Sequence, residues 1–252
     1  MIQFDTFYMQ CPKCRSWLEG QMLKSEMVNQ SLLYSDGKTL NDNYITILQH
    51  MIICPACGHW FWVEDFKEPL ITKEKPSGVC YTWNSWRFYG VHFASNEGKM
   101  ALINHYLKFL AKGPYDVDKE IYFRRFLWWA YNDLIRNHYQ IGLKYLFSGE
   151  MSFNVWRKNR RKLLQGVIMF KKHENQYLDN LKALLQLLEN RFTRDDENFE
   201  SINLEIIEMN RELREFAKAK ELLAQTTRRT YYIAHIEKKV KRKDSFVFLV
   251  TG

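Results

Sequence analysis

The stretch ITILQHMIICPACGHWFWVEDF, residues 45–66, decides how the N-terminal part of this chain folds. An apolar segment leads into Cys54 and Cys57, and aromatic residues follow them. Two cysteines separated by two residues form a tight turn that presents both sulfur atoms to one metal ion. Because a four-coordinate site needs two more ligands, the stretch predicts a partner turn elsewhere in the chain.

The partner turn is QCPKCRSW, residues 10–17, which repeats the two-residue spacing and the proline after the first cysteine. The two turns together predict a closed site of four thiolates, formed by Cys11, Cys14, Cys54 and Cys57. Disulfides or free thiols are the alternative. The first residues, MIQFDTFYMQ, lack the basic and apolar regions of a secretion signal, so we expect a cytoplasmic protein with reduced thiols.

One structural Zn²⁺ is the metal that this site predicts, because zinc favours a tetrahedron of thiolates. Iron is the alternative, since paired CPxCG turns also bind iron in rubredoxin-type sites. The second turn, CPACG, has the glycine, whereas Arg15 stands in its place after Cys14. His50 and His59 lie close to the second turn in the sequence and compete as ligands, but four sulfur atoms already complete the site.

At 252 residues with 46% apolar and 15% aromatic content, the chain can bury a substantial core. No apolar run reaches the roughly 18–20 residues needed to cross a bilayer, so no membrane partner is expected. Between the two cysteine turns, a hairpin signal stands at Asp36 and Gly37. Residues 1–70 are therefore predicted to form a small zinc-ribbon-like domain, in which the metal supplies much of the folding free energy.

Residues 71–96 predict an aromatic connector that packs on the helices that follow. The alternative role is to stack nucleic-acid bases, but only Arg87 is interleaved among the aromatic side chains, so packing is favoured. Cys80, the fifth cysteine, is expected to be a small buried hydrophobe. The aromatic residues are Trp83, Trp86, Phe88, Tyr89 and Phe93.

From residue 97 the apolar pattern changes to the period of α-helices, so the chain as a whole is predicted to be of the α+β class. Residues 97–225 form the predicted helical domain, and 226–252 a basic C-terminal helix and tail. The helix expected after Pro114 is apolar on more than one face and is expected to be central. The expected helical segments are 96–114, 116–139, 175–191, 198–213 and 216–225.

The segment NLEIIEMNRELREFAKAKELLAQ, residues 203–225, resembles a tetratricopeptide repeat. Phe216 and Ala219 match the positions where the two helices of such a repeat approach closely, and Arg214 stands where the turn glycine is usual. One repeat cannot bury its apolar face alone, so the earlier helices are expected to be its neighbours, in a diverged repeat array or an irregular bundle.

Two further matches define a wider resemblance: CPKC at 11–14, and IICPACGHWFWVEDF at 52–66. The chain resembles a bacterial family of the domain-of-unknown-function type, in which two CPxC turns precede tetratricopeptide-like helices. The resemblance implies that the four cysteines of the turns are metal ligands, and it carries no assigned reaction.

Most of the net charge of +8 lies beyond residue 113, because residues 1–113 hold 11 basic against 10 acidic side chains. Basic clusters either neutralise nucleic-acid phosphates or form solvated helix faces. The candidate nucleic-acid contacts are Arg157, Lys158, Arg160, Arg161, Lys162, Lys171, Lys172, Lys238, Lys239, Lys241, Arg242 and Lys243.

No catalytic motif is found, since GxSxG, GxxxxGK and GxGxxG patterns are absent and four thiolates leave a metal no open position. Asp195, Asp196 and Glu197 form an acidic cluster, but negative charge is favourable where a helix begins. We therefore expect a non-catalytic adaptor or scaffold that is stabilised by zinc and binds a protein or peptide. A nucleic-acid-binding zinc-ribbon protein is the alternative.

Overall fold

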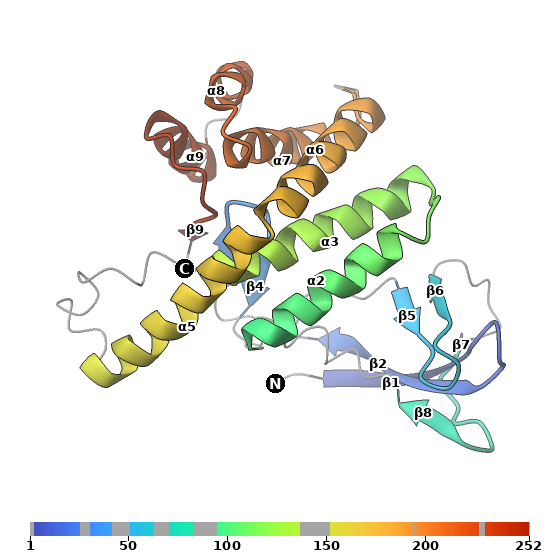
Figure 1. Cartoon of the computed structure of the whole chain (residues 1–252). Coiled ribbons are helices and arrows are strands. Elements are labelled where there is room, and N and C mark those ends of the chain that lie inside the picture. The colour runs from blue at the N-terminus through green and yellow to red at the C-terminus, as the bar shows by residue number, and fades with distance from the viewer. Residues whose placement is uncertain are drawn as a thin grey trace. The chain divides into compact units, whose positions relative to one another are not determined.

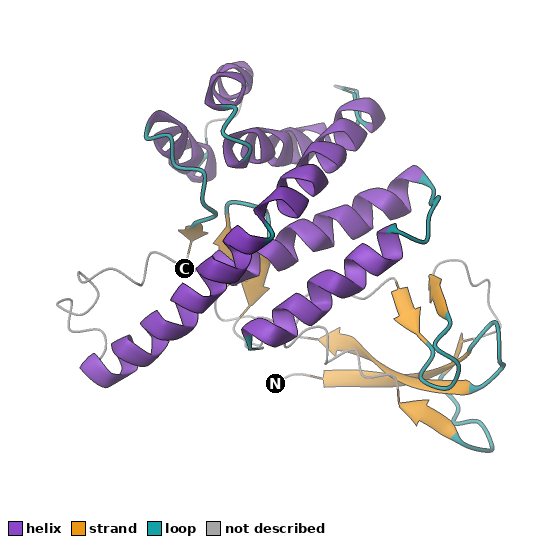
Figure 2. Ribbon diagram, viewed as in Figure 1, coloured by secondary structure: helices purple, strands orange, loops and turns teal. Residues whose placement is uncertain are grey.

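The computed structural model describes residues 3–25, 31–41, 51–62, 71–82, 95–136, 152–193, 195–226 and 230–251. The predicted α+β class is confirmed, because short strands fill the N-terminal part and helices follow them (Figures 1 and 2). The chain forms two compact units. The first consists of Met1–Ser31 and Leu40–Val91, and the second of Leu32–Thr39 and His92–Gly252. The aromatic cluster predicted within the connector lies outside the described residues.

The first unit contains a four-stranded sheet in the order β7-β1-β2-β8. Strand β1 (Gln3–Gln10) pairs antiparallel with β2 (Trp17–Ser25), and the first cysteine turn connects them. At the edges, β7 (Ile71–Thr72) runs antiparallel to β1, and β8 (Cys80–Thr82) runs parallel to β2.

The second cysteine turn connects a separate antiparallel pair in the same unit. Strand β5 (Met51–Ile53) pairs with β6 (Trp60–Trp62), with Ile53 opposite Trp60. Each cysteine pair therefore lies in the turn between two antiparallel strands, and the two tight turns that the sequence predicts are present. The buried cluster around the turns is small, and it consists of Met9, Cys11, Leu18, Cys54 and Phe61.

The predicted hairpin at Asp36 and Gly37 is present, with Gly37 at a φ of 76° that suits glycine. Its strands are β3 (Ser31–Tyr34) and β4 (Thr39–Asn41). The sequence places this hairpin within residues 1–70, whereas in the structure Leu32–Thr39 groups with the helices. Strand β3 also pairs with the C-terminal β9 (Leu249–Thr251), which gives the sheet order β4-β3-β9.

The second unit is mainly helical, and each helical segment expected from the sequence contains a helix. One further helix, α5, was not bounded by the sequence pattern. None of the described helices has the length and apolar character needed to span a bilayer. The helices are α2 (Asn96–Leu110), α3 (Val117–Ile135), α5 (Phe153–Lys172), α6 (Glu174–Arg191), α7 (Phe199–Glu212), α8 (Phe216–Gln225) and α9 (Tyr231–Lys241).

Helix α3 is central, as its apolar pattern predicts, and packs against α2, α5 and α6. Helix α5 approaches α3 very closely, because a Cβ atom added at Gly166 would lie 2.3 Å from the backbone oxygen of Leu134. A second apolar cluster joins α7, α8 and α9 with the C-terminal segment. Its buried residues are Ile207, Ala219, Leu223, Ile233, Ile236, Val240, Phe248 and Val250.

A buried ion cluster fixes the hairpin in the second unit. Two nitrogen atoms of Arg136 donate to the two carboxylate oxygens of Asp36, at 2.8 and 2.7 Å, and its Nε donates to Asp133 at 2.8 Å. Asp133 also pairs with Lys38 Nζ at 2.6 Å, and its backbone oxygen accepts from Lys99. Because the hairpin supplies both Asp36 and Lys38, its polar turn is held by side chains of α3 and of Arg136, which follows it.

Candidate metal centre

Four cysteine sulfur atoms lie together in the first unit. The Sγ atoms of Cys11, Cys14, Cys54 and Cys57 all lie within 4.8 Å of one another. Cys11 lies 3.7 Å from Cys57, and Cys14 lies 3.6 Å from Cys54. A disulfide would require a separation of about 2.05 Å, so these are free thiols. A metal ion with bonds of about 2.3 Å to four sulfurs at tetrahedral corners sets sulfur–sulfur distances near 3.8 Å, so the cluster fits a metal.

The two turns that carry the sulfurs have the same backbone geometry. In the first, the amide of Arg15 donates to the Cys11 oxygen at 2.9 Å, and in the second the amide of Gly58 donates to the Cys54 oxygen at 2.8 Å. Arg15 and Gly58 have left-handed φ values of 61° and 65°. Arg15 therefore adopts the conformation that the missing glycine would supply, and the exception in the sequence does not alter the site.

Burial divides each pair of sulfurs in the same way. Cys11 and Cys54, the first cysteine of each turn, are fully buried, whereas Cys14 and Cys57 are exposed. The buried pair belongs to the apolar cluster of the unit, so a metal bound here would lie against that core. The exposed pair gives an ion an approach from solvent.

The pKa values of Cys14, Cys54 and Cys57 are shifted in different directions, and a bound cation would favour the thiolate form of each. Hydrogen bonding between Cys14 and Ser16 lowers the pKa of the Cys14 thiol to about 6. Burial raises the pKa of Cys54 to about 12, and it also raises the pKa of Cys57. Thiolates are the species that bind metal, and a coordinated cation favours the charged form of every ligand. The set suits a resident cation better than a thiol nucleophile.

Histidine takes no part in the cluster among the described residues. His59 contributes its backbone oxygen, which accepts from the Cys54 amide at 2.8 Å, and its ring stacks with Phe61. His50 lies outside the described residues. Cys80, the remaining cysteine, is partly buried on β8 and does not belong to the sulfur cluster.

Replacing Arg15 by glycine is expected to stabilise the first unit. The left-handed conformation costs an L-residue about 1–2 kcal/mol, and the freedom that glycine gains in the unfolded chain offsets a part of this. We expect Arg15→Gly to raise the free energy of unfolding by about 0.5–1 kcal/mol, measured by urea unfolding with excess metal.

Gly58→Ala is the matched counterpart, since a Cβ at Gly58 would meet no atom within 4 Å and its effect comes from φ alone. It is expected to lower stability by a similar amount. A loss of stability in Arg15→Gly would contradict the equivalence of the two turns.

The candidate nucleic-acid contacts of the sequence are distributed over two helices. Those from Arg157 to Lys172 all lie on α5, and those from Lys238 to Lys243 lie at the end of α9 and just beyond it. In the second group, Lys239 pairs with Asp244 at 2.5 Å and Lys241 with Glu237 at 3.3 Å. Within each of the two basic groups, the side chains are therefore neighbours on one helix or directly after it.

A polar cluster that sequence analysis missed lies in the core of the second unit. The Glu212 carboxylate accepts from Trp128 Nε1 at 2.7 Å, from Asn132 and from the Tyr177 hydroxyl. Burial and the nearby charge of Glu208 raise the pKa of Glu212 to about 8. Its side chain is fully buried, and these contacts connect α7 to its neighbours in the core. Trp128 and Asn132 come from α3 and Tyr177 from α6, so the cluster depends on contacts between residues far apart in the sequence.

Comparison of the chain with protein-family models, with curated proteins and with solved structures found no match. The family and the repeat class that the sequence resembles therefore stay predictions. The assignment of function depends on the sulfur cluster, the surfaces of the helical unit and their charges.

Proposed function

We propose that the protein is a zinc-stabilised interaction protein, in which the helical unit binds a peptide segment of a partner protein. Four thiolates in two CPxC turns, with two sulfurs buried in the core of a small unit, support a closed structural Zn²⁺ site. Such a site has no open position for substrate. A small unit gains from a metal the folding free energy that its core does not supply.

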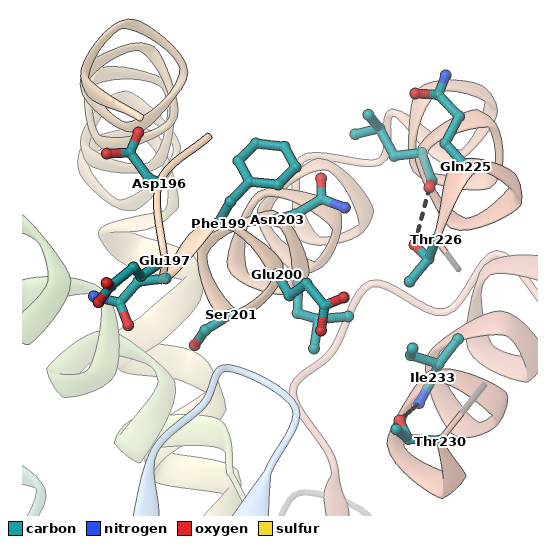
Figure 3. A pocket seen from close by; sticks show the side chains of 13 residues that line it. Asp196, Glu197, Phe199, Glu200, Ser201, Asn203, Gln225, Thr226, Thr230 and Ile233 are labelled. Atoms are coloured by element: carbon teal, nitrogen blue, oxygen red, sulfur yellow. Dashed lines mark hydrogen bonds between the residues drawn. The ribbon is translucent and has the colours of Figure 1, made fainter. Parts of the chain in front are cut away.

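The observation that carries the binding role is a groove of about 700 Å³ in the helical unit. Side chains from the start of α7, the end of α8 and the start of α9 surround it (Figure 3). This volume lies within the range of about 300–1,000 Å³ that is typical of ligand sites. The apolar residues that line it are Phe199, Leu204, Leu222 and Ile233.

Acidic side chains along the groove favour a cationic occupant. Asp196 is engaged within its own turn, where it accepts from the Thr193 amide at 2.6 Å. Glu197 and Glu200 are exposed and line the groove, and neither forms an ion pair with another described residue. A peptide with an apolar anchor flanked by Lys or Arg matches both the apolar lining and these carboxylates.

A tetratricopeptide-like pairing of α7 and α8 is part of the proposal. Arg214, in the turn between them, has a left-handed φ of 67°, which is the conformation that the usual glycine provides. Ala219 of α8 is fully buried beside Ile207 of α7, as close helix pairing requires. Repeat arrays commonly offer such paired helices to extended peptides.

The test is peptide binding followed by fluorescence anisotropy. The probes are labelled nine-residue peptides with Leu or Phe between two Lys or Arg residues, and counterparts in which Gln replaces the basic residues. We expect the basic peptides alone to bind. The double variant Glu197→Gln/Glu200→Gln should bind them about 5- to 10-fold more weakly, since it removes two ion pairs that contribute about 0.5–0.7 kcal/mol each.

The matched control is Glu215→Gln/Glu221→Gln, which removes the same charge from exposed positions that do not line the groove. Its affinity should stay within about twofold of the wild type, because exposed charges that do not line the groove are screened by salt. Equal weakening in both variants, or binding of the Gln peptides as tight as that of the basic ones, would contradict the groove as a site for cationic peptides.

A further inference from the structure

Helix α5 carries an unusual charge. Its 20 residues include seven basic side chains and no acidic one, and all seven are exposed. Most helices on a protein surface mix the two signs of charge, which lowers their self-repulsion. The basic residues are Arg157, Lys158, Arg160, Arg161, Lys162, Lys171 and Lys172.

The charges repel one another within the helix. Arg157 lies one turn from Arg161, and Lys158 lies one turn from Lys162, so like charges face each other at the i and i+4 positions. No ion pair to a carboxylate relieves this repulsion within the part of the chain that the structure describes. An anionic partner bound to α5 would relieve this repulsion.

The basic group on α9 provides the contrast within the same unit. There Lys239 and Lys241 are held by Asp244 and Glu237, so intramolecular carboxylates already neutralise part of the group. The two basic groups that the sequence treats alike are therefore different. Only α5 keeps its whole charge available for a partner.

The geometry of α5 distinguishes among anionic partners. Its apolar side packs on the protein through Trp156, Gly166 and Phe170, the residues of α5 that are buried. A helix that lies in a membrane surface needs its apolar face free to enter the lipid, and here Trp156 and Phe170 of that face are buried against the protein. The apolar side chains of α5 that are exposed, Phe153, Val155 and Ile168, do not form one continuous face with them. The exposed side carries its charge in two groups, one from Arg157 to Lys162 and one at Lys171 and Lys172, and together they span about 22 Å at about 1.5 Å per residue.

We propose that α5 binds double-stranded DNA by placing its basic side against the phosphates that border the major groove. A helix of about 10–12 Å in diameter fits the B-DNA major groove, which is about 12 Å wide, whereas the deep, narrow major groove of an RNA duplex excludes it. The basic residues extend to both edges of the exposed side, so they can contact phosphates on both strands. Phosphate contacts of this kind do not read sequence. This surface is separate from the peptide groove and does not depend on it.

The experiment measures binding of a labelled 20-base-pair DNA duplex of arbitrary sequence by anisotropy, between about 50 and 200 mM salt. The variant Arg157→Gln/Lys158→Gln/Arg161→Gln removes three exposed charges from α5, and Gln preserves helix propensity. We expect its affinity at about 100 mM salt to fall at least tenfold. The slope of log K against log salt should decrease by about 2.7, since each phosphate contact contributes about 0.9.

The matched control is Lys238→Gln/Arg242→Gln/Lys243→Gln, which removes three exposed charges from the other basic group. It should keep the wild-type slope to within about one contact. The conservative variant Arg157→Lys/Arg161→Lys should also bind DNA, because phosphate contacts need charge more than a planar group. Circular dichroism of every variant checks that the helices persist.

Three results would overturn the proposal. Equal losses of DNA affinity in the α5 variant and the α9 control would show that binding depends on the net charge of the protein and not on α5. A wild-type protein that fails to bind the duplex at low salt, or that prefers an RNA duplex of the same length, would remove double-stranded DNA as the partner. Binding to phosphatidylserine vesicles without binding to DNA would assign α5 to a membrane surface.

Discussion

Cys54→Ser is expected to abolish metal binding and to unfold the first unit. The serine hydroxyl cannot replace a buried thiolate, and Cys54 belongs both to the sulfur cluster and to the small core of the unit. Structural zinc contributes about 10–16 kcal/mol in zinc-finger peptides, which exceeds the stability of a typical small domain. Metal content measured by mass spectrometry should fall from one equivalent to a trace.

Hydrogen exchange distinguishes unfolding of the first unit from global unfolding. Amides of residues 3–25 and 51–62 should exchange rapidly in Cys54→Ser, while those of the central helix α3 stay protected. Because protein with exposed apolar strands aggregates, we also expect lower soluble expression. Protection of residues 3–25 that is unchanged after metal loss would show that the metal does not stabilise this unit.

Cys80→Ser is the matched control, since it makes the same atomic change in the same unit at a cysteine outside the sulfur cluster. It should retain one equivalent of metal and the wild-type hydrogen-exchange pattern.

Mass spectrometry of the wild-type protein also identifies the metal. Purified wild-type protein that contains one equivalent of iron, which gives a red ferric tetrathiolate, would replace the proposed zinc by iron.

Asp36→Asn is expected to have the second large effect, on the helical unit. The substitution is nearly isosteric, but it removes the charge opposite Arg136 and turns one acceptor into a donor that faces the guanidinium. Breaking a buried ion pair on one side costs about 3–5 kcal/mol. The free energy of unfolding should fall by this amount, measured by denaturant unfolding followed by far-ultraviolet circular dichroism, which reports the helices.

Asp118→Asn offers the same chemical change in an exposed ion pair. Asp118 pairs with Arg191 at 3.1 Å, and the two side chains are 70% and 45% exposed. Exposed pairs contribute about 0.2–1 kcal/mol, so a loss of at most about 1 kcal/mol is expected. A loss in Asp36→Asn no larger than that in Asp118→Asn would show that the buried cluster does not hold the hairpin in place.

The metal centre could be predicted because its information is local. Each CPxC turn places two sulfurs by its own backbone, so only the pairing of the two turns was left to infer. The expectation that left-handed turn positions carry glycine was less reliable, since Arg15 and Arg214 both adopt left-handed conformations. A strongly constrained turn can impose that conformation on another residue at a cost of about 1–2 kcal/mol.

The helices were predictable where a broad apolar stripe marks them, as in α3 and α6. Helix α5 has only a narrow buried side around Trp156, Gly166 and Phe170, and basic side chains dominate its first half, so its bounds were not predicted. The position of the hairpin could not be predicted, because it depends on contacts between distant residues. Asp36 and Arg136 lie 100 residues apart, and the pairing of β3 with β9 joins Leu33 to Thr251.

The hairpin also bears on the order of events during synthesis. At about 5–20 residues per second, a ribosome would deliver Asp36 roughly 5–20 seconds before Arg136, which follows it by 100 residues. The segments on both sides of Leu32–Thr39 belong to the first unit, and this includes the second cysteine turn. A metal captured by the four sulfurs would close the intervening loop before Arg136, the partner of Asp36, has been synthesised.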